Sequence, residues 1–94
     1  MLSVTASPSF TRIAKKLHTK DKQVLDEAIQ WVAANHQNGE EKKGDLAGVF
    51  IYTFKLNQQE TLLAYELKPD KFKPSALVLL AVGPHENFYA ALKR

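Results

Sequence analysis

Three apolar segments in the second half of the chain constrain its fold more than any other feature. Residues 49–56 read VFIYTFKL, residues 61–67 read TLLAYEL and residues 76–82 read ALVLLAV. β-branched and aromatic residues favour strands, and short polar connections between such runs favour antiparallel neighbours. The three segments therefore predict an antiparallel meander. Because residues 76–82 are apolar throughout, we expect this strand to be central and covered on both faces.

Polar segments separate these strands. Residues 57–59 (NQQ) are expected to turn the chain from the first strand into the second. Residues 68–75 (KPDKFKPS) form a lysine-rich loop before the third strand, and residues 39–45 (GEEKKGD) form a charged loop ahead of the first. Proline, glycine and asparagine mark such connections, so we expect loops at all three places.

The chain begins with a strand and a helix. Residues 2–6 (LSVTA) alternate as a short strand does. Ser7 and Pro8 then predict a helix start, because a serine side chain caps free N–H groups and proline suits the first helical position. The apolar face of this helix comprises Phe10, Ile13, Ala14 and Leu17. The basic residues Arg12, Lys15 and Lys16 take the other side, which we interpret as a solvated face.

A second helix is predicted over residues 20–36. Thr19 is expected to cap it, and Asn38 with Gly39 is expected to end it. Two consecutive helices joined by a short turn form a helical hairpin. Residues 84–93 are expected to form a short closing helix with Pro84 near its start. Its inward-packing residues would be Phe88, Ala91 and Leu92.

These elements predict an α+β fold. The expected order is an N-terminal strand, a helical hairpin, an antiparallel β-meander and a short C-terminal helix, with the helices on one side of a small twisted sheet. A chain of 94 residues fits one domain spanning residues 1–94.

The composition indicates in which cellular compartment the protein works and what charge its partners carry. The chain has no cysteine, which excludes a disulfide framework and fits a reducing compartment. It shows neither a signal peptide nor an apolar run of the roughly 20 residues that a membrane span needs, so we expect a cytoplasmic protein. Thirteen Lys and Arg against ten Asp and Glu give a net charge of +3, which suits an acidic partner or nucleic acid without requiring one.

Four segments together resemble the RelE/ParE superfamily of toxins. SVTASPSFTRIAKKL, KKGDLAGVFIYTFKL, TLLAYEL and VGPHENFYAALKR follow in the order and length typical of that superfamily. The resemblance implies a bacterial toxin of a type II toxin–antitoxin pair, held silent by a cognate antitoxin. RelE-like members cleave mRNA in the ribosome, whereas ParE-like members poison DNA gyrase and are not known as nucleases. Ribosome and mRNA, or alternatively gyrase, are thus the implied targets.

The closing segment carries the predicted catalytic residues. RNA cleavage without a metal needs a base for the 2′-hydroxyl, an acid for the leaving oxygen and a cation for the phosphate. Histidine is the side chain whose ordinary pKa lies near neutrality, and His85 follows the last predicted strand directly. Tyr89 would share a helical face with it and matches the terminal tyrosine of the family, and Glu86 is a possible base. Lys55 lies where the resemblance places a basic residue. The alternative is a surface histidine, a packed tyrosine and a solvated glutamate.

Four further cations are predicted to bind phosphate. Lys42 and Lys43 precede the first meander strand, and Lys93 and Arg94 end the chain. Together with Lys55 they would form one positive patch around the terminal motif. Taken one at a time, each is interpreted as a solvent-exposed surface charge.

The chain also departs from the nuclease pattern. Leu62 stands near the place where RelE-like nucleases carry a strand arginine, and Pro84 with His85 stands where they carry another. Loss of both would remove a transition-state clamp typically worth roughly 3 kcal/mol. A non-enzymatic, ParE-like toxin is therefore the alternative. No metal or cofactor is expected, because the histidines are scattered and no glycine-rich nucleotide motif occurs.

Overall fold

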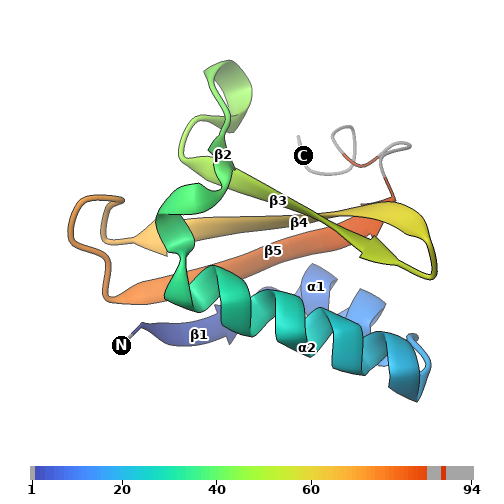
Figure 1. The fold of residues 1–94 in the computed structure, drawn as a ribbon. Helices are drawn as coiled ribbons and strands as arrows, with labels where there is room; N and C mark the ends of the chain where they lie inside the picture. Colours follow the sequence, from blue (N-terminus) through green and yellow to red (C-terminus); the bar gives the residue numbers. More distant parts are fainter. Residues whose placement is uncertain (1, 85–87, 89–94) are drawn as a thin grey trace.

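The structure is a computed structural model that describes residues 2–84 and 88. Its central element is one five-stranded sheet with the order β1-β5-β4-β3-β2 (Figure 1). β1 runs parallel to β5, and the other neighbours are antiparallel. The elements in chain order are β1 (Ser3–Ala6), α1 (Pro8–Lys15), α2 (Thr19–Ala34), the 3₁₀ turn η1 (His36–Asn38), β2 (Glu40–Glu41), the 3₁₀ turn η2 (Gly44–Leu46), β3 (Val49–Leu56), β4 (Gln59–Lys68) and β5 (Ala76–Pro84).

This architecture confirms the predicted α+β fold with its first strand, helical hairpin and meander. The charged segment 39–45 was expected to be a loop throughout, but Glu40 and Glu41 form β2 beside Ile51 and Phe50. The meander also extends further than predicted, because β5 continues through Gly83 and Pro84 instead of stopping before them. Pro84 is therefore the end of a strand. The predicted closing helix falls on residues outside the described part of the chain, apart from Phe88.

The middle strand is β4, not β5 as the apolar run suggested. Residues Thr61 to Tyr65 are buried without a break, whereas residues along β5 alternate between buried and half-buried. β5 lies between β1 and β4, so it is an interior strand, but its second face is only half covered. An uninterrupted apolar run alone cannot distinguish these two positions in the sheet.

The two helices begin differently. Ser7 caps α1 as predicted: its Oγ accepts a hydrogen bond of 3.1 Å from the N–H of Phe10 and donates one of 2.9 Å to the carbonyl of Leu80. α2 starts one residue earlier than expected, with Thr19 inside the helix and His18 at the cap position. The His18 side chain makes no capping hydrogen bond.

The β3–β4 turn is tighter than predicted. Only Asn57 and Gln58 connect the strands, and both have positive φ, 54° and 65°. Two consecutive residues of this kind are typical of the two-residue hairpin whose twist matches that of its strands. Gln59 therefore belongs to β4, opposite Leu56.

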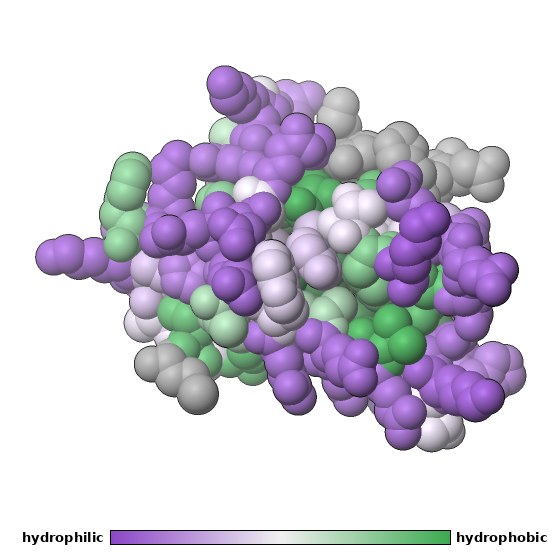
Figure 2. All heavy atoms as spheres, viewed as in Figure 1, coloured by the Kyte–Doolittle hydropathy of each residue, from purple (hydrophilic) through white to green (hydrophobic). Residues whose placement is uncertain are grey.

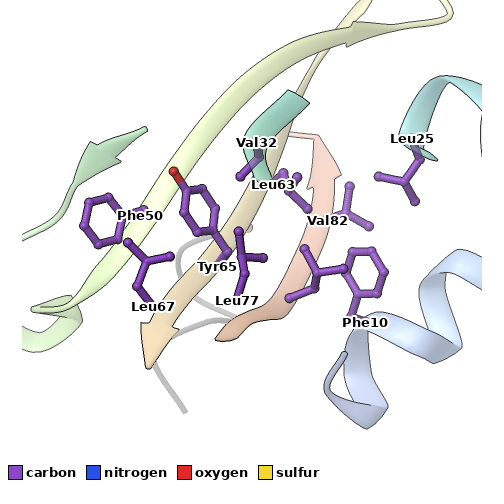
Figure 3. Close-up of a cluster of buried hydrophobic side chains, with 10 residues drawn as sticks. Phe10, Leu25, Val32, Phe50, Leu63, Tyr65, Leu67, Leu77 and Val82 are labelled. Atoms are coloured by element: carbon purple, nitrogen blue, oxygen red, sulfur yellow. The ribbon is translucent and has the colours of Figure 1, made fainter. Parts of the chain in front are cut away.

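Apolar clusters cover both faces of the sheet. On one face, Phe10 of α1 and Leu25 and Val32 of α2 pack on the strands (Figure 3). Their strand partners are Phe50, Leu63, Tyr65, Leu67, Leu77, Leu79 and Val82. On the opposite face, here called the far face, Phe88 packs with Leu46 and four strand residues. Those four are Val49, Ile51, Leu62 and Ala64. The inward packing predicted for Phe88 is thus confirmed.

Candidate functional site

Lys55 lies at the hairpin end of the sheet. It is exposed, faces Glu60 across the strand pair, and points to the far face because it alternates with Val49 and Ile51. The neighbouring row of the register runs from Phe54 through Thr61 to Pro84. Two strand spacings of about 4.8 Å place Pro84 roughly 10 Å from β3 at this row. Lys55 therefore stands close to the residue that precedes His85 in the sequence.

Most of the predicted catalytic set falls outside the described residues. This applies to His85, Glu86, Tyr89, Lys93 and Arg94. The described residues on either side of His85 and Glu86 are Pro84, at the end of β5, and Phe88, which is 6% exposed within the far-face cluster. Pro84 therefore lies at the hairpin end of the sheet, and Phe88 lies on the far face.

Lys42 and Lys43 lie at the other end of β3. The N–H of Lys42 donates to the carbonyl of Val49 at 2.8 Å, and its ammonium pairs with Glu40 at 3.1 Å. Lys43 is exposed at the start of η2. Six residues of strand separate Val49 from Lys55, or about 20 Å at roughly 3.3 Å per residue. The structure does not bring these two lysines together with Lys55, so the three do not form one patch.

Leu62 is part of the apolar core. It is 3% exposed, stands in register between Thr53 and Gly83, and belongs to the cluster around Phe88. An arginine at this place would bury its guanidinium among aliphatic side chains. Within residues 2–84 and Phe88, position 62 therefore contributes an aliphatic side chain and no cation to the far face, in agreement with the departure seen in the sequence.

Arg12 and Lys16 were assigned from the sequence to a solvated helix face and not to a candidate site. Both line a cleft of about 700 Å³ between α1, η2 and the far face. Its floor includes Val49, Leu80 and Ala81, and its other charged residues are Asp45 and Glu66. The basic side of α1, interpreted as merely solvated, thus borders a cleft on the far face. Ile13 lies next to Arg12 and was assigned to the apolar face of the helix, but it is 38% exposed and lines the same cleft.

Tyr65 is a structural residue. Its hydroxyl donates to the carbonyl of His36 at 2.9 Å and accepts the N–H of Gly39. Burial raises the pKa of Tyr65 to about 12, an effect that the bond from Gly39 partly offsets. A phenol of this kind stays protonated at neutral pH and does not serve as an acid or base there.

Two kinds of feature are absent from the described residues. Among residues 2–84 and Phe88, no three or more His, Asp or Glu side chains gather as metal ligands would. In the same part of the chain, neither helix is long and apolar enough to cross a membrane.

Comparison with known proteins gives the family. Residues 4–93 match the family described as the ParE-like toxin of type II bacterial toxin–antitoxin systems. No curated protein matches the chain. Among solved structures, a free mutant of the E. coli toxin RelE has 13% identity and a TM-score of 0.71, covering 98% of this chain and 92% of that one.

Two further E. coli structures share the fold. The intact RelBE toxin–antitoxin complex contains a chain with 14% identity and a TM-score of 0.69, covering 92% of this chain and 99% of that one. The isolated RelE toxin has 15% identity and a TM-score of 0.66, covering 100% of this chain and 98% of that one. At these identities the likeness concerns the fold, while the family match spans nearly the whole chain. The chain therefore belongs to the ParE-like toxins of type II bacterial toxin–antitoxin systems.

Proposed function

We propose that this toxin stops growth by cutting mRNA on the ribosome. The observation that carries the proposal is the register of the sheet, in which Pro84, Thr61 and Phe54 share one row and Lys55 occupies the next. An exposed cation thus stands beside the strand end from which the His85 segment departs. The fold shared with E. coli RelE supports the same reading.

The proposed reaction needs no metal. The 2′-oxygen attacks the neighbouring phosphorus, and the bond from phosphorus to the 5′-oxygen breaks. His85 transfers one of the two protons involved, and Glu86 or Tyr89 transfers the other. Lys55 stabilises the negative charge that grows on the phosphate. Lys93 and Arg94, with Lys42 and Lys43 further away, hold the RNA backbone through their charge.

A second candidate function rests on Leu62. Because this position is apolar and buried beneath Phe88, the far face offers a packed surface where a nuclease would place a guanidinium. The cleft beside it has an apolar floor and a balanced set of charges, Arg12 and Lys16 against Asp45 and Glu66. Such a surface suits a protein partner, and the toxin would then inhibit DNA gyrase or another protein without cutting RNA.

An antitoxin is the expected partner under either function. The solved RelBE complex shows such a pairing for the E. coli toxin. On this chain, the cleft between α1 and the sheet is our proposed binding site. Antitoxins of this kind use a segment that orders on binding. The mixed charges of the cleft would fix how that segment is aligned along it.

One experiment separates the two functions. Wild type, His85→Ala, Lys55→Ala and the control Lys20→Ala, which removes an exposed lysine of α2, are induced in cells, and primer extension on a reporter mRNA maps any cuts. The nuclease predicts translation-dependent cuts that are lost in His85→Ala, reduced at least tenfold in Lys55→Ala and kept in Lys20→Ala. Growth arrest with intact mRNA, unchanged in His85→Ala, would overturn it and leave gyrase supercoiling as the next assay.

A further inference from the structure

The loop between β4 and β5 presents one exposed aromatic ring. Phe72 is 79% exposed, the highest value among the large hydrophobic side chains described. Figure 2 shows this end of the molecule, at the left of the view, as a mainly hydrophilic surface with a hydrophobic group standing out from it. A single exposed apolar side chain is ordinary on a protein surface, so the case for a ligand depends on what surrounds the ring.

Hydrogen bonds hold this loop in shape. The Asp70 carboxylate accepts the N–H groups of Phe72 and Lys73 at 2.8 and 2.9 Å. These two bonds also lower the pKa of Asp70, with Lys73 the larger cause. At the base of the loop, the N–H of Ser75 donates to the carbonyl of Lys68 at 2.7 Å. The ring is therefore presented by a preformed turn, which reduces the entropy lost when it binds a partner.

A pocket of about 290 Å³ adjoins the ring. Phe50 and Leu67, each 6% exposed, supply its apolar part. Gln37, Glu41 and Lys71 supply an amide, a carboxylate and an ammonium at its margin. Apolar side chains with hydrogen-bonding groups beside them suit a planar heterocycle, whose faces are apolar and whose edges are polar.

Lysines flank the ring in the sequence: Lys71 and Lys73 stand on either side of Phe72, and Lys68 begins the loop. Glu66 pairs with Lys68 and Glu41 with Lys71, so together with Asp70 three carboxylates balance the three lysines. Lys71 pairs with Glu41 at 2.7 Å and lies 5.4 Å from the centre of the Phe72 ring. Exposed ion pairs of this kind contribute about 1 kcal/mol or less, so Lys71 can exchange Glu41 for another anion. An aromatic ring interleaved with lysines is typical of single-stranded nucleic acid sites, whereas lysine is depleted in protein–protein interfaces.

We propose that this loop binds an unpaired base of an RNA strand. The base stacks on Phe72 with its polar edge toward Gln37 and Glu41, and Lys71 and Lys73 contact the phosphates on either side. The inference rests on the proposed function insofar as RNA is the target. It adds a second contact, about 27 Å along β4 from the Lys55 end at roughly 3.4 Å per residue. Phe50 and Leu67 belong to the face that the helices cover, whereas Lys55 points to the far face, so the RNA would pass from one face of the sheet to the other.

The test measures RNA binding apart from cleavage. The probe is a fluorescein-labelled single-stranded 12-mer with 2′-O-methyl riboses, which lacks the hydroxyl that attacks phosphorus. Binding is followed by fluorescence anisotropy for the wild type, Phe72→Trp, Phe72→Leu and Phe72→Ala. Trp31→Leu is the matched control, because it removes a partly exposed aromatic ring from another site. Circular dichroism and urea midpoints verify that each variant is folded.

The expected result follows from the chemistry of stacking. Phe72→Trp binds at least as tightly as the wild type, and Phe72→Leu and Phe72→Ala bind about tenfold more weakly, since a stacked base contributes roughly 1–3 kcal/mol. Trp31→Leu keeps wild-type affinity. Equal affinity for Phe72→Leu and the wild type would overturn the proposal, because a leucine preserves apolar contact but not stacking. Absence of binding by the wild type, with mRNA cuts still mapped in cells, would overturn this site and leave the nuclease intact. Phe72-dependent binding without mRNA cuts would support this site and overturn the nuclease.

Discussion

Asn57 Nδ2 donates a hydrogen bond of 3.0 Å to Asp21 Oδ2, joining the β3–β4 turn to the start of α2 across 36 residues of sequence. The Asp21 side chain is buried, with the residue 9% exposed. Asn57 also tolerates the positive φ that the turn requires. One side chain therefore shapes the hairpin next to Lys55 and fixes it to the helical layer.

The contribution of this bond is testable with Asn57→Gly. Glycine keeps the positive φ without strain, so the substitution removes only the side-chain bond and leaves a buried carboxylate oxygen without its partner. We expect the free energy of unfolding in urea to fall by about 1–3 kcal/mol. Gln58→Gly is the matched control, because Gln58 has the same sign of φ and the bond to Asp21 comes from the side chain of Asn57. An equal loss in both variants would mean that the turn itself, not the Asp21 contact, carries the effect.

Ser7 connects α1 to β5 and offers a second prediction. Its hydroxyl makes two hydrogen bonds, one to the helix N-terminus and one to the carbonyl of Leu80. Ser7→Ala is expected to lower the free energy of unfolding by about 1–2 kcal/mol, as the loss of an N-cap does. Ser9→Ala, at an exposed position two residues further along the chain, is expected to change it by less than about 0.5 kcal/mol. Urea denaturation of the two variants measures the difference, and similar values would contradict the cap assignment.

Tyr65 predicts a loss of stability at alkaline pH. Its pKa is raised to about 12 in the folded state against 10.0 for a free tyrosine, so the unfolded chain releases the phenolic proton first. The contribution of Tyr65 is fully present below pH 10 and is lost as the pH rises toward 12, by an amount on the order of 2 kcal/mol.

Comparison with Tyr65→Phe isolates this effect from the titration of lysines. The variant lacks the phenol, so the difference in unfolding free energy between wild type and variant should shrink between pH 9 and pH 11.5. A difference that stays constant over this range would show that Tyr65 ionises equally in both states.

The close approach of Gly39 to Tyr65 leads to a further prediction, a steric coupling between positions 39 and 65. A Cβ at position 39 would collide with the Tyr65 hydroxyl. Gly39→Ala should therefore destabilise the fold by about 1–3 kcal/mol. The double variant Gly39→Ala with Tyr65→Phe removes the clashing oxygen and should recover part of that loss. A double-mutant cycle in urea measures the coupling, and strictly additive effects would disprove it.

Local patterns in the sequence were sufficient for most of the elements. The period of Phe10, Ala14 and Leu17 predicted α1, and the alternation along residues 49–56 predicted β3, because helices and strands repeat side chains at different intervals. β2 was not predicted, because its residues show no such repeat. Two glutamates carry no apolar pattern, and only the neighbouring edge of β3 makes them a strand.

The candidate site was less accessible from sequence. The order of segments was enough to recognise the family, and the family match over residues 4–93 confirms that assignment. The positions of the cations were not predictable in the same way. Lys42 and Lys55 are near in sequence yet stand at opposite ends of β3, because a strand extends the chain by roughly 3.3 Å per residue.

By itself, then, the sequence determined the element types, the α+β class and the family, since these depend on local period, capping and the order of segments. Only the tertiary structure decided which residues meet. It placed β1 beside β5 across 73 residues of chain, put Leu62 in the core and turned Arg12 toward the cleft. It also brought Pro84 into register with the strand end that carries Lys55. Pairing between distant strands follows from the packing of the whole sheet, and no local pattern encodes it.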